Sequence, residues 1–575
     1  MIKKIIYVLL VICSIQAYGQ QGFNWVDDIG GVTGSAVSYA ITADSVGNVY
    51  TTGYFSYTVD INPGVMVDNR VANGAEDIFI TKVDANGNFL WAKNIGGAGA
   101  LNEGRAISID TAGNVYLTGF FGGTTDFDPG IGVYNLISNG GREIFILKLT
   151  ANGDFVWAKA IGSSNFDEGL GIKLDNNGHV YTTGYFDGTV DFNPNAGICN
   201  LTGSVDPFIL KLDTAGNFIW AKSMTGLMDN DYGSSITIDD AENVYTTGGF
   251  NLTVDFDPGS STYNLISNGD YDIFVSKLDA NGNFVWAKSI GGTQHDVGRA
   301  LCLDRTGHIY ITGSFRASVD FNTGVGVFYL NTLANNDDDA FISKLDTAGN
   351  FMWAQKLGGY GGQYAFSITA DMVGNIYTTG FFTNTVDFDP STAVYSLTAV
   401  GLEDIFISKL NTNGDFICAT TIGSVANDVG SSIYVDKKGN VYTTGTFMSV
   451  MDFNPDPNTT FNITPQGGPD VFISKLSQTC LTNVAIQNYK NENNTIELFP
   501  NPVQNIVNIQ LPKPIDKFDN TNYLILYDAT GKETLKEPIY HQNFSLDVSA
   551  FAKGFYMVAI TKGNIILYTH KLMIN

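Results

Sequence analysis

The sequence predicts an all-β protein, a seven-bladed β-propeller of four-stranded blades followed by a small Ig-like β-sandwich. One pattern occurs seven times: Asp-x-x-Gly-Asn-x-Tyr, then Val-Asp-Phe, Asp-x-Phe-Ile-x-Lys-Leu and Gly-Asn-Phe-x-Trp-Ala-Lys. Its tyrosine recurs every 64 to 67 residues, at Tyr50, Tyr116, Tyr181, Tyr245, Tyr310, Tyr377 and Tyr442. Helical periodicity is absent from the repeats. A period of this length is typical of propellers, in which copies of one sheet cover each other's apolar faces.

Each copy contains four strand signals. In the copy at residues 104–169, apolar or β-branched segments at 106–110, 115–121, 143–149 and 155–161 alternate with turn residues. We name these strands a, b, c and d. A longer polar insert separates b from c, which explains why the period exceeds that of a plain four-stranded blade.

The copies are out of phase with the chain. The segment Phe23-Asn24-Trp25 matches strand d but has no a, b or c before it, and the last copy stops after its c strand at 471–476. Every blade is complete only if the first d strand joins the last a, b and c strands. The phase therefore predicts a ring closed by the N-terminal strand, because closure removes an exposed sheet edge.

The chain ends predict export. Lys3 and Lys4 precede an apolar run at 5–12, and Ala17-Tyr18-Gly19 supplies small residues for cleavage before Gln20. We therefore expect a signal peptide at 1–19, the propeller at 20–482, a polar linker at 483–495 and a final β domain at 496–575. No later apolar run reaches membrane-spanning length.

The formal net charge is −26, and the excess acid lies in the repeats because charges balance in the last domain. Such a surface repels nucleic acid and anionic lipid. We therefore expect no nucleic-acid partner, and a protein that is soluble outside the cell and tolerates divalent cations or basic partners.

Cys199, Cys302, Cys418 and Cys480 follow the expected signal peptide, and none has metal-ligand spacing. Cys418 stands where other copies have Trp, and Cys480 ends the last repeat. A Cys418–Cys480 disulfide is one interpretation for an exported protein, and small buried side chains are the other.

Four residues recur at fixed places, and we expect structural roles for all of them. The b-strand glycine indicates close backbone approach, as at Gly53 and Gly119. The d-strand tryptophan, as at Trp91, is expected to wedge between blades. The aspartate of Val-Asp-Phe and the c-strand lysine, as at Lys82, are expected to form a pair, or the aspartate is a cap.

A metal is the alternative for the aspartates. Three copies place two carboxylates close together, so calcium is a candidate ligand: Asp126 with Asp128, Asp255 with Asp257, and Asp387 with Asp389. The second acid is Asn in the other copies, so the ligand charge is not kept. No other cofactor is predicted.

Strand parity sorts the connections into two faces. The a–b and c–d turns are short and repetitive, whereas the b–c inserts and d–a connections of the other face differ between copies. Variable loops on a rigid scaffold are where binding usually occurs. The d–a connections carry acids that we expect to form an acidic rim at the pore mouth: Glu103, Asp167, Glu168, Asp231, Asp296 and Asp428.

No catalytic constellation is visible. The repeats contain only His179, His295 and His308, and Arg105, Arg299, Arg305 and Arg316 form no repeated triad. An enzyme would need a nucleophile, a base or paired acids in a few blades only. We therefore predict that the protein is not an enzyme.

The repeats resemble the bacterial SBBP β-propeller repeat over roughly residues 22 to 480. The matching stretches include Asp-Thr-Ala-Gly-Asn-Val-Tyr-Leu-Thr-Gly at 110–119 and Asp-Ile-Phe-Val-Ser-Lys-Leu-Asp-Ala-Asn-Gly-Asn-Phe-Val-Trp-Ala-Lys at 272–288. The resemblance implies the propeller fold and no particular activity.

The last domain resembles the C-terminal sorting domain of the type IX secretion system. Phe-Pro-Asn-Pro at 499–502, Leu-Tyr-Asp-Ala-Thr-Gly-Lys at 526–532, Gly-Phe-Tyr at 554–556 and the terminal Lys-Leu-Met-Ile-Asn at 571–575 occur in the family's order. The resemblance implies a Bacteroidetes-type cell, recognition by the secretion machinery and removal of this domain. It also implies release or attachment to surface lipopolysaccharide.

These observations favour a secreted or cell-surface binding or adhesion module that holds a glycan or a surface protein through its variable face. Two alternatives stay open: a polysaccharide hydrolase or lyase that uses the same face, and a passive component of the surface coat.

Overall fold

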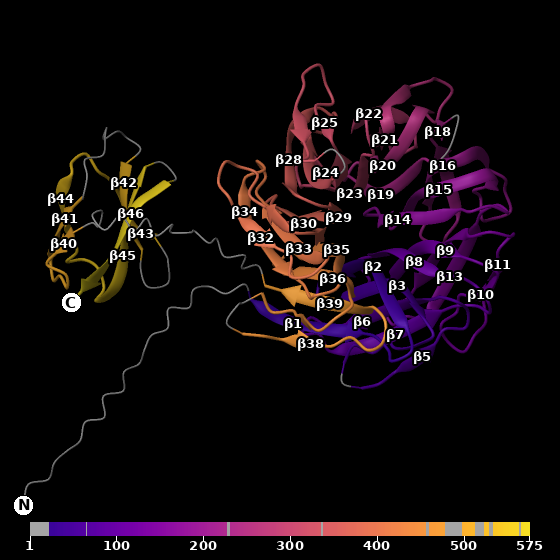
Figure 1. Ribbon diagram of the computed structural model, residues 1–575, viewed down its shortest axis with the longest axis horizontal. Coiled ribbons are helices and arrows are strands. Elements are labelled where there is room, and N and C mark those ends of the chain that lie inside the picture. The colour runs from indigo at the N-terminus through magenta and orange to yellow at the C-terminus, as the bar shows by residue number, and fades with distance from the viewer. Residues whose placement is uncertain are drawn as a thin grey trace, which may run out of the picture. The chain divides into compact units, whose positions relative to one another are not determined.

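The computed structural model describes residues 22–64, 66–226, 230–334, 337–455, 459–477, 497–511, 522–527, 533–562 and 565–575. It divides into two compact units, Met1–Thr482 and Asn483–Asn575. All regular elements of the described residues are strands (Figure 1). No helix in these ranges is long and apolar enough to cross a membrane. The predicted signal peptide 1–19 and linker 483–495 lie outside the described residues.

Each repeat copy forms one antiparallel sheet in the order a-b-c-d. We number the sheets along the chain from the sheet that begins with β2. Sheet 1 contains β2 (Ser35–Ala43), β3 (Val49–Ser56), β6 (Asp77–Val83) and β7 (Phe89–Ile95); sheet 2 contains β8 (Glu103–Ile109), β9 (Val115–Phe121), β12 (Glu143–Leu149) and β13 (Phe155–Ile161). Sheet 3 contains β14 (Glu168–Leu174), β15 (Val180–Asp191), β16 (Asn200–Leu212) and β17 (Phe218–Ser223); sheet 4 contains β19 (Tyr232–Ile238), β20 (Val244–Asp255), β21 (Asn264–Leu278) and β22 (Phe284–Gly292); sheet 5 contains β23 (Val297–Leu303), β24 (Ile309–Arg316), β27 (Asp338–Leu345) and β28 (Phe351–Gly359). Sheet 6 contains β29 (Gln363–Ala370), β30 (Ile376–Phe382), β33 (Asp404–Leu410) and β34 (Phe416–Ile422); sheet 7 contains β35 (Val429–Val435), β36 (Val441–Phe447), β39 (Asp470–Leu476) and β1 (Phe23–Ile29).

The b–c inserts are not irregular loops. In sheets 3 and 4 the b and c strands simply continue into the insert as one long hairpin. In the other sheets the insert contains separate short strands: β4 (Thr58–Asp60) and β5 (Asn69–Val71), β10 (Thr124–Asp126) and β11 (Asn135–Ile137), β25 (Ser318–Asp320) and β26 (Tyr329–Asn331), β31 (Thr385–Asp387) and β32 (Ser396–Thr398), and β37 (Met451–Asp452) and β38 (Asn462–Ile463). The short β18 (Thr225–Gly226) pairs with β20.

The first strand of the chain completes the last sheet. β1 pairs antiparallel with β39, with Trp25 opposite Lys475. The outer edge of sheet 7 is therefore covered by a segment from the opposite end of the repeats, which confirms the pairing that the phase of the repeats predicts.

The a strands lie innermost and contact one another in succession. β2 contacts β8 and β35, and the chain of contacts runs on through β14, β19, β23 and β29. Figure 1 shows the sheets standing around a common centre, the propeller-like arrangement that the repeats predict.

The core of the first unit lies between neighbouring sheets rather than at the centre. Tyr50, Ile78 and Ile80 of sheet 1, for example, pack against Phe121 and Phe145 of sheet 2. The aromatic and β-branched residues on both faces of each sheet are buried in this way, because each sheet is covered by its neighbours.

The second unit consists of two antiparallel sheets. One contains β40 (Glu497–Phe499), β41 (Ile506–Gln510) and β44 (Asn543–Asp547), and the other contains β43 (Glu533–Pro538), β42 (Asn522–Tyr527), β45 (Gly554–Lys562) and β46 (Ile565–Ile574). Val507 and Leu546 from one sheet share a core with Leu524, Val558 and Leu572 from the other.

Candidate functional site

The recurring glycine of strand b is a packing requirement. A Cβ atom on Gly119 would lie 1.9 Å from the carbonyl oxygen of Glu103 in the adjacent a strand. The same approach, at 1.8 to 1.9 Å, occurs at Gly53, Gly184, Gly248, Gly313, Gly380 and Gly445. The close backbone approach expected at this position is thus confirmed.

The recurring tryptophan joins neighbouring sheets. The indole Nε1 of Trp91 donates to the carbonyl of Ala151 in the c–d turn of the next sheet, at 3.2 Å. Lys82 donates to the same carbonyl at 3.0 Å, and its Nζ lies 4.8 Å from the ring centre of Tyr50. The wedge is confirmed, whereas the suggested Asp–Lys pair is wrong because this lysine binds a backbone carbonyl instead.

The aspartates of the Val-Asp-Phe slot cap the inserts. Asp126 accepts hydrogen bonds from the backbone N–H of Asp128, at 3.1 Å, and of Tyr134, at 2.8 Å. Asp128 in turn accepts from Gly130 at 2.8 Å. Asn does the same at position 62, where its oxygen accepts from Gly64 at 2.9 Å. This shared role explains why Asp and Asn interchange there.

Asp255 with Asp257 and Asp387 with Asp389 make the same caps. Backbone hydrogen bonds therefore account for all six predicted calcium candidates. The calcium site stays a prediction.

The acidic rim is not what the structure forms. Asp167, Asp231, Asp296 and Asp428 are each 0% exposed. Each accepts a backbone N–H from strand b or from the residue that follows it; Asp296 accepts from Arg316 at 2.9 Å. Asp167, Asp296 and Asp428 also accept a backbone N–H from the d–a connection or the last residue of strand d, so each of these three joins two segments of the backbone. All four residues are therefore corrected from a binding rim to buried carboxylates that hold the backbone.

Glu103 and Glu168 are also buried, at 7% and 4% exposure, but they face arginines. Arg105 lies 3.0 Å from Glu103 and 3.8 Å from Glu168, and Arg142 lies 2.7 Å from Glu168. The Arg105 guanidinium lies 4.2 Å from the ring centre of Tyr39. Burial raises the pKa of Glu103, and the arginines oppose this effect.

Every a strand contains a β-bulge, which the sequence analysis did not predict. The register of each a strand shifts by one residue against strand b, and the residue inside the shift is Tyr39, Arg105, Leu170, Ser234, Arg299, Phe366 or Ser431. A bulge re-aims its side chain. These seven partly exposed residues, here named the bulge ring, differ between copies although their neighbours hardly change.

The second arginine of the bulge ring has different surroundings. The Arg299 guanidinium lies 5.6 Å from the ring centre of Phe366, and its charge lowers the pKa of Tyr232 and of Tyr364, although burial raises both pKa values more strongly. Within the described residues no carboxylate lies at ion-pair distance from Arg299. Its buried Nε atom has no hydrogen-bond partner in this part of the chain.

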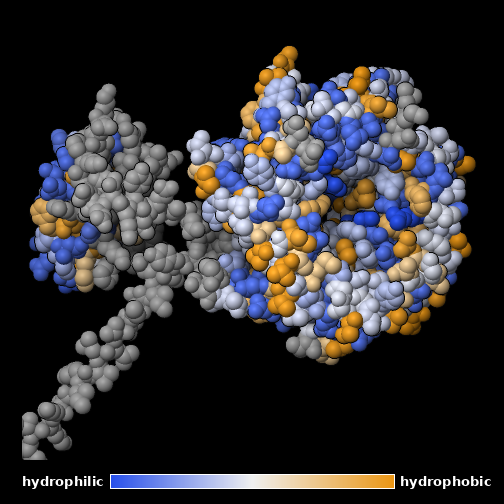
Figure 2. All heavy atoms as spheres, viewed as in Figure 1, coloured by the Kyte–Doolittle hydropathy of each residue, from blue (hydrophilic) through white to orange (hydrophobic). Residues whose placement is uncertain are grey.

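Arginine is concentrated at this end of the a strands. The whole chain has six arginines, and four of them, Arg105, Arg142, Arg299 and Arg316, lie at the a-strand bulges or at the b and c strand ends beside them. Arg316 forms a bidentate pair with Asp338, at 3.1 and 2.7 Å, and Tyr364 donates to the same carboxylate. Figure 2 shows that the ring of sheets is hollowed at its centre and that hydrophilic surface borders the hollow.

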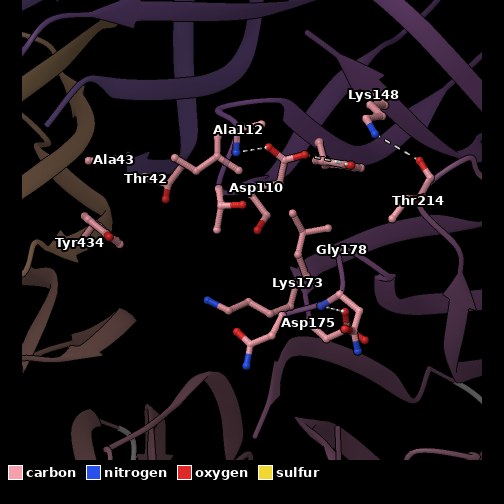
Figure 3. Close-up of a pocket in the computed structure, with 17 residues that line it drawn as sticks. Thr42, Ala43, Asp110, Ala112, Lys148, Lys173, Asp175, Gly178, Thr214 and Tyr434 are labelled. Carbon is pink, nitrogen blue, oxygen red and sulfur yellow. Dashed lines mark hydrogen bonds between the residues drawn. The ribbon is translucent and has the colours of Figure 1, made fainter. Parts of the chain in front are cut away.

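A pocket of about 400 Å³ lies at the other ends of the a strands. Thr42, Ser108, Lys173 and Tyr434 line it from four different inner strands, and the a–b turns at 110–112 and 175–178 complete it. Figure 3 shows Lys173 pointing into the open space.

Beside this pocket, a ligand atom of Asp175, one of His179 and one of Glu242 lie within 4.8 Å of one another. The sequence offers one sign of this group: Glu242 stands where the other copies have glycine. For the bulge ring the corresponding sign is a variable position between small residues, as in Gly104-Arg105-Ala106.

The cysteine predictions are partly tested. Cys418 is disulfide-bonded, whereas Cys199 and Cys302 are free. The expected partner, Cys480, lies outside the described residues.

Comparison with known proteins identifies the last domain. Residues 497–575 match the model of the secretion system C-terminal sorting domain. The protein is therefore one that the type IX secretion system exports, to the cell surface or into the medium, and it interacts with that machinery. The resemblance stated for this domain is confirmed.

The repeats have more distant relatives. The chain is 24% identical over 489 residues to the uncharacterized WD repeat-containing protein L264 of Acanthamoeba polyphaga mimivirus, covering 71% of this chain and 35% of that protein. It is 30% identical over 176 residues to the regulatory protein FlaEY of Caulobacter vibrioides, covering 30% of this chain and 17% of that protein. The chain thus spans about a third of the first relative and less of the second.

Two solved structures align with the chain at low similarity. Sqt1 from Chaetomium thermophilum has a TM-score of 0.36 and 8% identity, covering 79% of this chain and all of that chain. PorZ, a surface component of the type IX secretion system of Porphyromonas gingivalis, has a TM-score of 0.24 and 11% identity, covering 96% and 75%. These values support no statement about function.

Proposed function

We propose that this exported protein is a non-catalytic binding module of the cell surface. In this proposal the SBBP-type repeats form a complete seven-bladed propeller, and the ligand binds at the bulge-ring end of its centre. One observation carries it: the bulge ring varies from copy to copy on a backbone that is otherwise repeated. Residues that serve only the scaffold have no reason to differ at equivalent positions.

The chemistry of the site favours a carboxylate-bearing sugar. Arg299 is a cation without a carboxylate partner among the described residues, and a guanidinium binds a carboxylate through two parallel hydrogen bonds. Tyr364 and Phe381 stack beside it with ring centres 5.0 Å apart, and Phe366 lies 6.4 Å from Tyr364. Aromatic faces supply the apolar contact surface that pockets for small molecules use.

Several carboxylates at this site already have partners. Glu103 and Glu168 face arginines, and Asp338 is held by Arg316 and Tyr364. A general acid and base must be free to exchange protons with a substrate. This supports binding rather than hydrolysis or elimination.

The remaining parts of the proposal concern export. We infer that the two sheets of residues 497–575 form an Ig-like sandwich that is removed on secretion, after which the propeller is released or held on lipopolysaccharide. Glycan or protein contact then takes place outside the cell.

The test is binding of the full mature chain to an array of neutral and uronate-containing glycans. We expect retention of uronate-containing glycans and at least a tenfold loss of affinity for Arg299→Ala, since a lost charge-assisted pair costs about 1.5–3 kcal/mol. Arg70→Ala is the control, because the ion pair of Arg70 among the described residues is with Asp68, in an exposed insert.

Unchanged binding by Arg299→Ala would contradict the site, and the absence of any glycan binding would contradict the function. Cleavage of a bound polysaccharide, seen as new reducing ends or unsaturated products, would instead establish the hydrolase or lyase alternative.

A further inference from the structure

We propose that Asp175, His179 and Glu242 form a binding site for a divalent cation of the zinc type at the junction of sheets 3 and 4. Their ligand atoms lie within 4.8 Å of one another, and all three side chains are half-buried. The site is on the turn face, at the opposite ends of the strands from the bulge ring, so it is independent of the proposed glycan site.

Sheet 3 supplies two of the ligands from one turn. Asp175 Oδ1 accepts hydrogen bonds from the backbone N–H of Asn177, at 2.8 Å, and of His179, at 2.9 Å, which fixes the turn. Oδ2 of the same carboxylate lies 2.7 Å from His179 Nδ1. Five of the other copies have Asn at the histidine position, and Asn114 shows its use there: it donates to Asp110 at 2.8 Å. The scaffold therefore does not require histidine.

Sheet 4 supplies the third ligand from an unusual position. Glu242 has φ of +62°, and the other six copies have glycine there, at Gly47, Gly113, Gly178, Gly307, Gly374 and Gly439. A non-glycine residue in this conformation is strained. The same position faces the preceding sheet: a Cβ atom on Gly113 would lie 3.7 Å from the hydroxyl of Tyr50. Glutamate at this point thus delivers a carboxylate across the junction.

Two groups hold this carboxylate in the metal-free arrangement. Asn177 donates to Glu242 Oε1 at 2.7 Å, and Lys211 lies 3.0 Å from Oε2. The equivalent lysines show where Lys211 can go: Lys82 and Lys475 donate to the c–d turn carbonyl of the next sheet. For Lys211 that acceptor is Ala280, which receives Trp220 Nε1 at 3.2 Å. On metal binding, Lys211 would thus exchange its present acceptor, Glu242, for the carbonyl of Ala280.

The ligand set selects the type of cation. One imidazole nitrogen with two carboxylates suits zinc and its first-row neighbours, whereas calcium takes oxygen ligands only. Three protein ligands leave a coordination position open. The pocket of about 400 Å³ is lined by Asp175 and by 176–178, so the pocket adjoins the site.

The chain contains a matched control. His308 lies 2.9 Å from Asp304 in the equivalent turn of sheet 5, so it reproduces the Asp–His pair of sheet 3. The next sheet has Gly374 where sheet 4 has Glu242, and the third ligand is missing. Only the sheet 3 turn is then expected to bind metal.

The experiment titrates the full mature chain with zinc chloride by calorimetry and follows the unfolding temperature with and without zinc. We expect one high-affinity site, lost at least tenfold in Glu242→Gly and in His179→Asn and unchanged in His308→Asn. Zinc should raise the unfolding temperature of the wild-type chain and of His308→Asn only.

Both test substitutions install residues that other copies use at the same position, so folding is expected to persist. Equal zinc affinity in the wild-type chain and Glu242→Gly, or no site in the wild-type chain, would overturn the proposal. An equal loss in His308→Asn would also overturn it, because a two-ligand turn would then suffice.

Discussion

At the residue scale, most of the repeated pattern is explained by close contacts between neighbouring strands and neighbouring sheets. At the b-strand glycine, the backbone of strand a leaves no room for a Cβ atom. The d-strand tryptophan donates a hydrogen bond to the next sheet. The turn glycine Gly153 has φ of +79°, and a Cβ atom there would lie 3.3 Å from Trp91 and 2.6 Å from Lys93. These roles could be predicted from the sequence because a position that is constant over all copies serves the scaffold.

The first prediction concerns this glycine. Gly119→Ala should lower the free energy of unfolding by several kcal/mol, since the added methyl group would lie 1.9 Å from a backbone carbonyl that cannot rotate away. Chemical denaturation of the purified variant measures the change.

Gly122→Ala, just after the end of the same strand, is the control. Its added Cβ atom would meet nothing closer than 3.7 Å, and its backbone is not in the left-handed region, so its stability should stay near that of the wild-type chain. Equal effects of the two substitutions would show that close approach is not the reason for glycine at position 119.

The acids of the d–a connections show where residue-level prediction fails. Asp167 and Asp296 look like surface carboxylates because acids are mostly exposed. In the structure they are buried and accept backbone N–H groups of two different connections. Sequence spacing does not show which backbone groups are left unpaired, so it does not show which carboxylates are needed inside.

At the element scale, the two ends of the repeat region depend on each other. β1 is short and stands alone at the start of the chain, yet Trp25 in it donates to the carbonyl of Ala85 in sheet 1 and pairs with β39. The strand therefore covers the edge of sheet 7 and packs that sheet onto sheet 1. The phase of the repeats predicts this pairing, and the structure confirms it.

The second prediction follows from this strand. Removal of residues 22–30 should expose the edge of β39, lower the unfolding temperature and cause self-association, because an unpaired edge strand recruits other chains. Size-exclusion chromatography and thermal unfolding report both effects.

A synthetic peptide of residues 22–30 added in excess should restore the unfolding temperature by mass action. The same peptide with Trp25→Ala should restore less, since it lacks the indole that donates to Ala85 at 3.2 Å. A truncated chain that stays monomeric and as stable as the intact one would refute the closing role of β1.

At the scale of the whole molecule, the fold buries many carboxyl groups. Burial raises the pKa of Asp296 and of Asp470 to about 7 and that of Asp428 to about 6, in each case with desolvation as the main cause. The folded state therefore binds protons more tightly than the unfolded chain at these sites.

The third prediction is the resulting pH dependence. A carboxyl group with a raised folded-state pKa contributes stability that is complete below its unfolded value near 3.8 and is lost as pH rises through the folded value, about 6 to 7. The unfolding temperature should therefore fall between about pH 4 and pH 7. Repulsion within a chain of charge −26 acts in the same direction but is screened by salt.

Thermal unfolding across this pH range at low and high salt separates the two causes. The fall should persist at high salt if buried carboxyl groups are responsible. A stability that is flat or rises with pH would contradict the assignment.

Function is also decided at this scale. The last domain carries a sorting signal that can be read directly from its sequence, because its motifs occur in order within one short segment. The proposed binding site could not be read from the sequence in the same way. Arg105, Arg142, Arg299 and Arg316 are far apart in the chain, and only the closing of the sheets onto a common centre brings them to one end of it.

By itself the sequence determined the all-β class, the strand order within each repeat, the pairing of the chain's first strand with the last repeat, and the export route. It could do so because the strand and turn signals are local properties of the sequence, and they recur in each of the seven copies. The tertiary structure decided which acids are buried, which residues lie in the bulges of the inner strands, and that Glu242 meets Asp175 and His179. These outcomes depend on register shifts and on contacts between sheets. Such contacts join residues far apart in the chain, so the local sequence does not predict them.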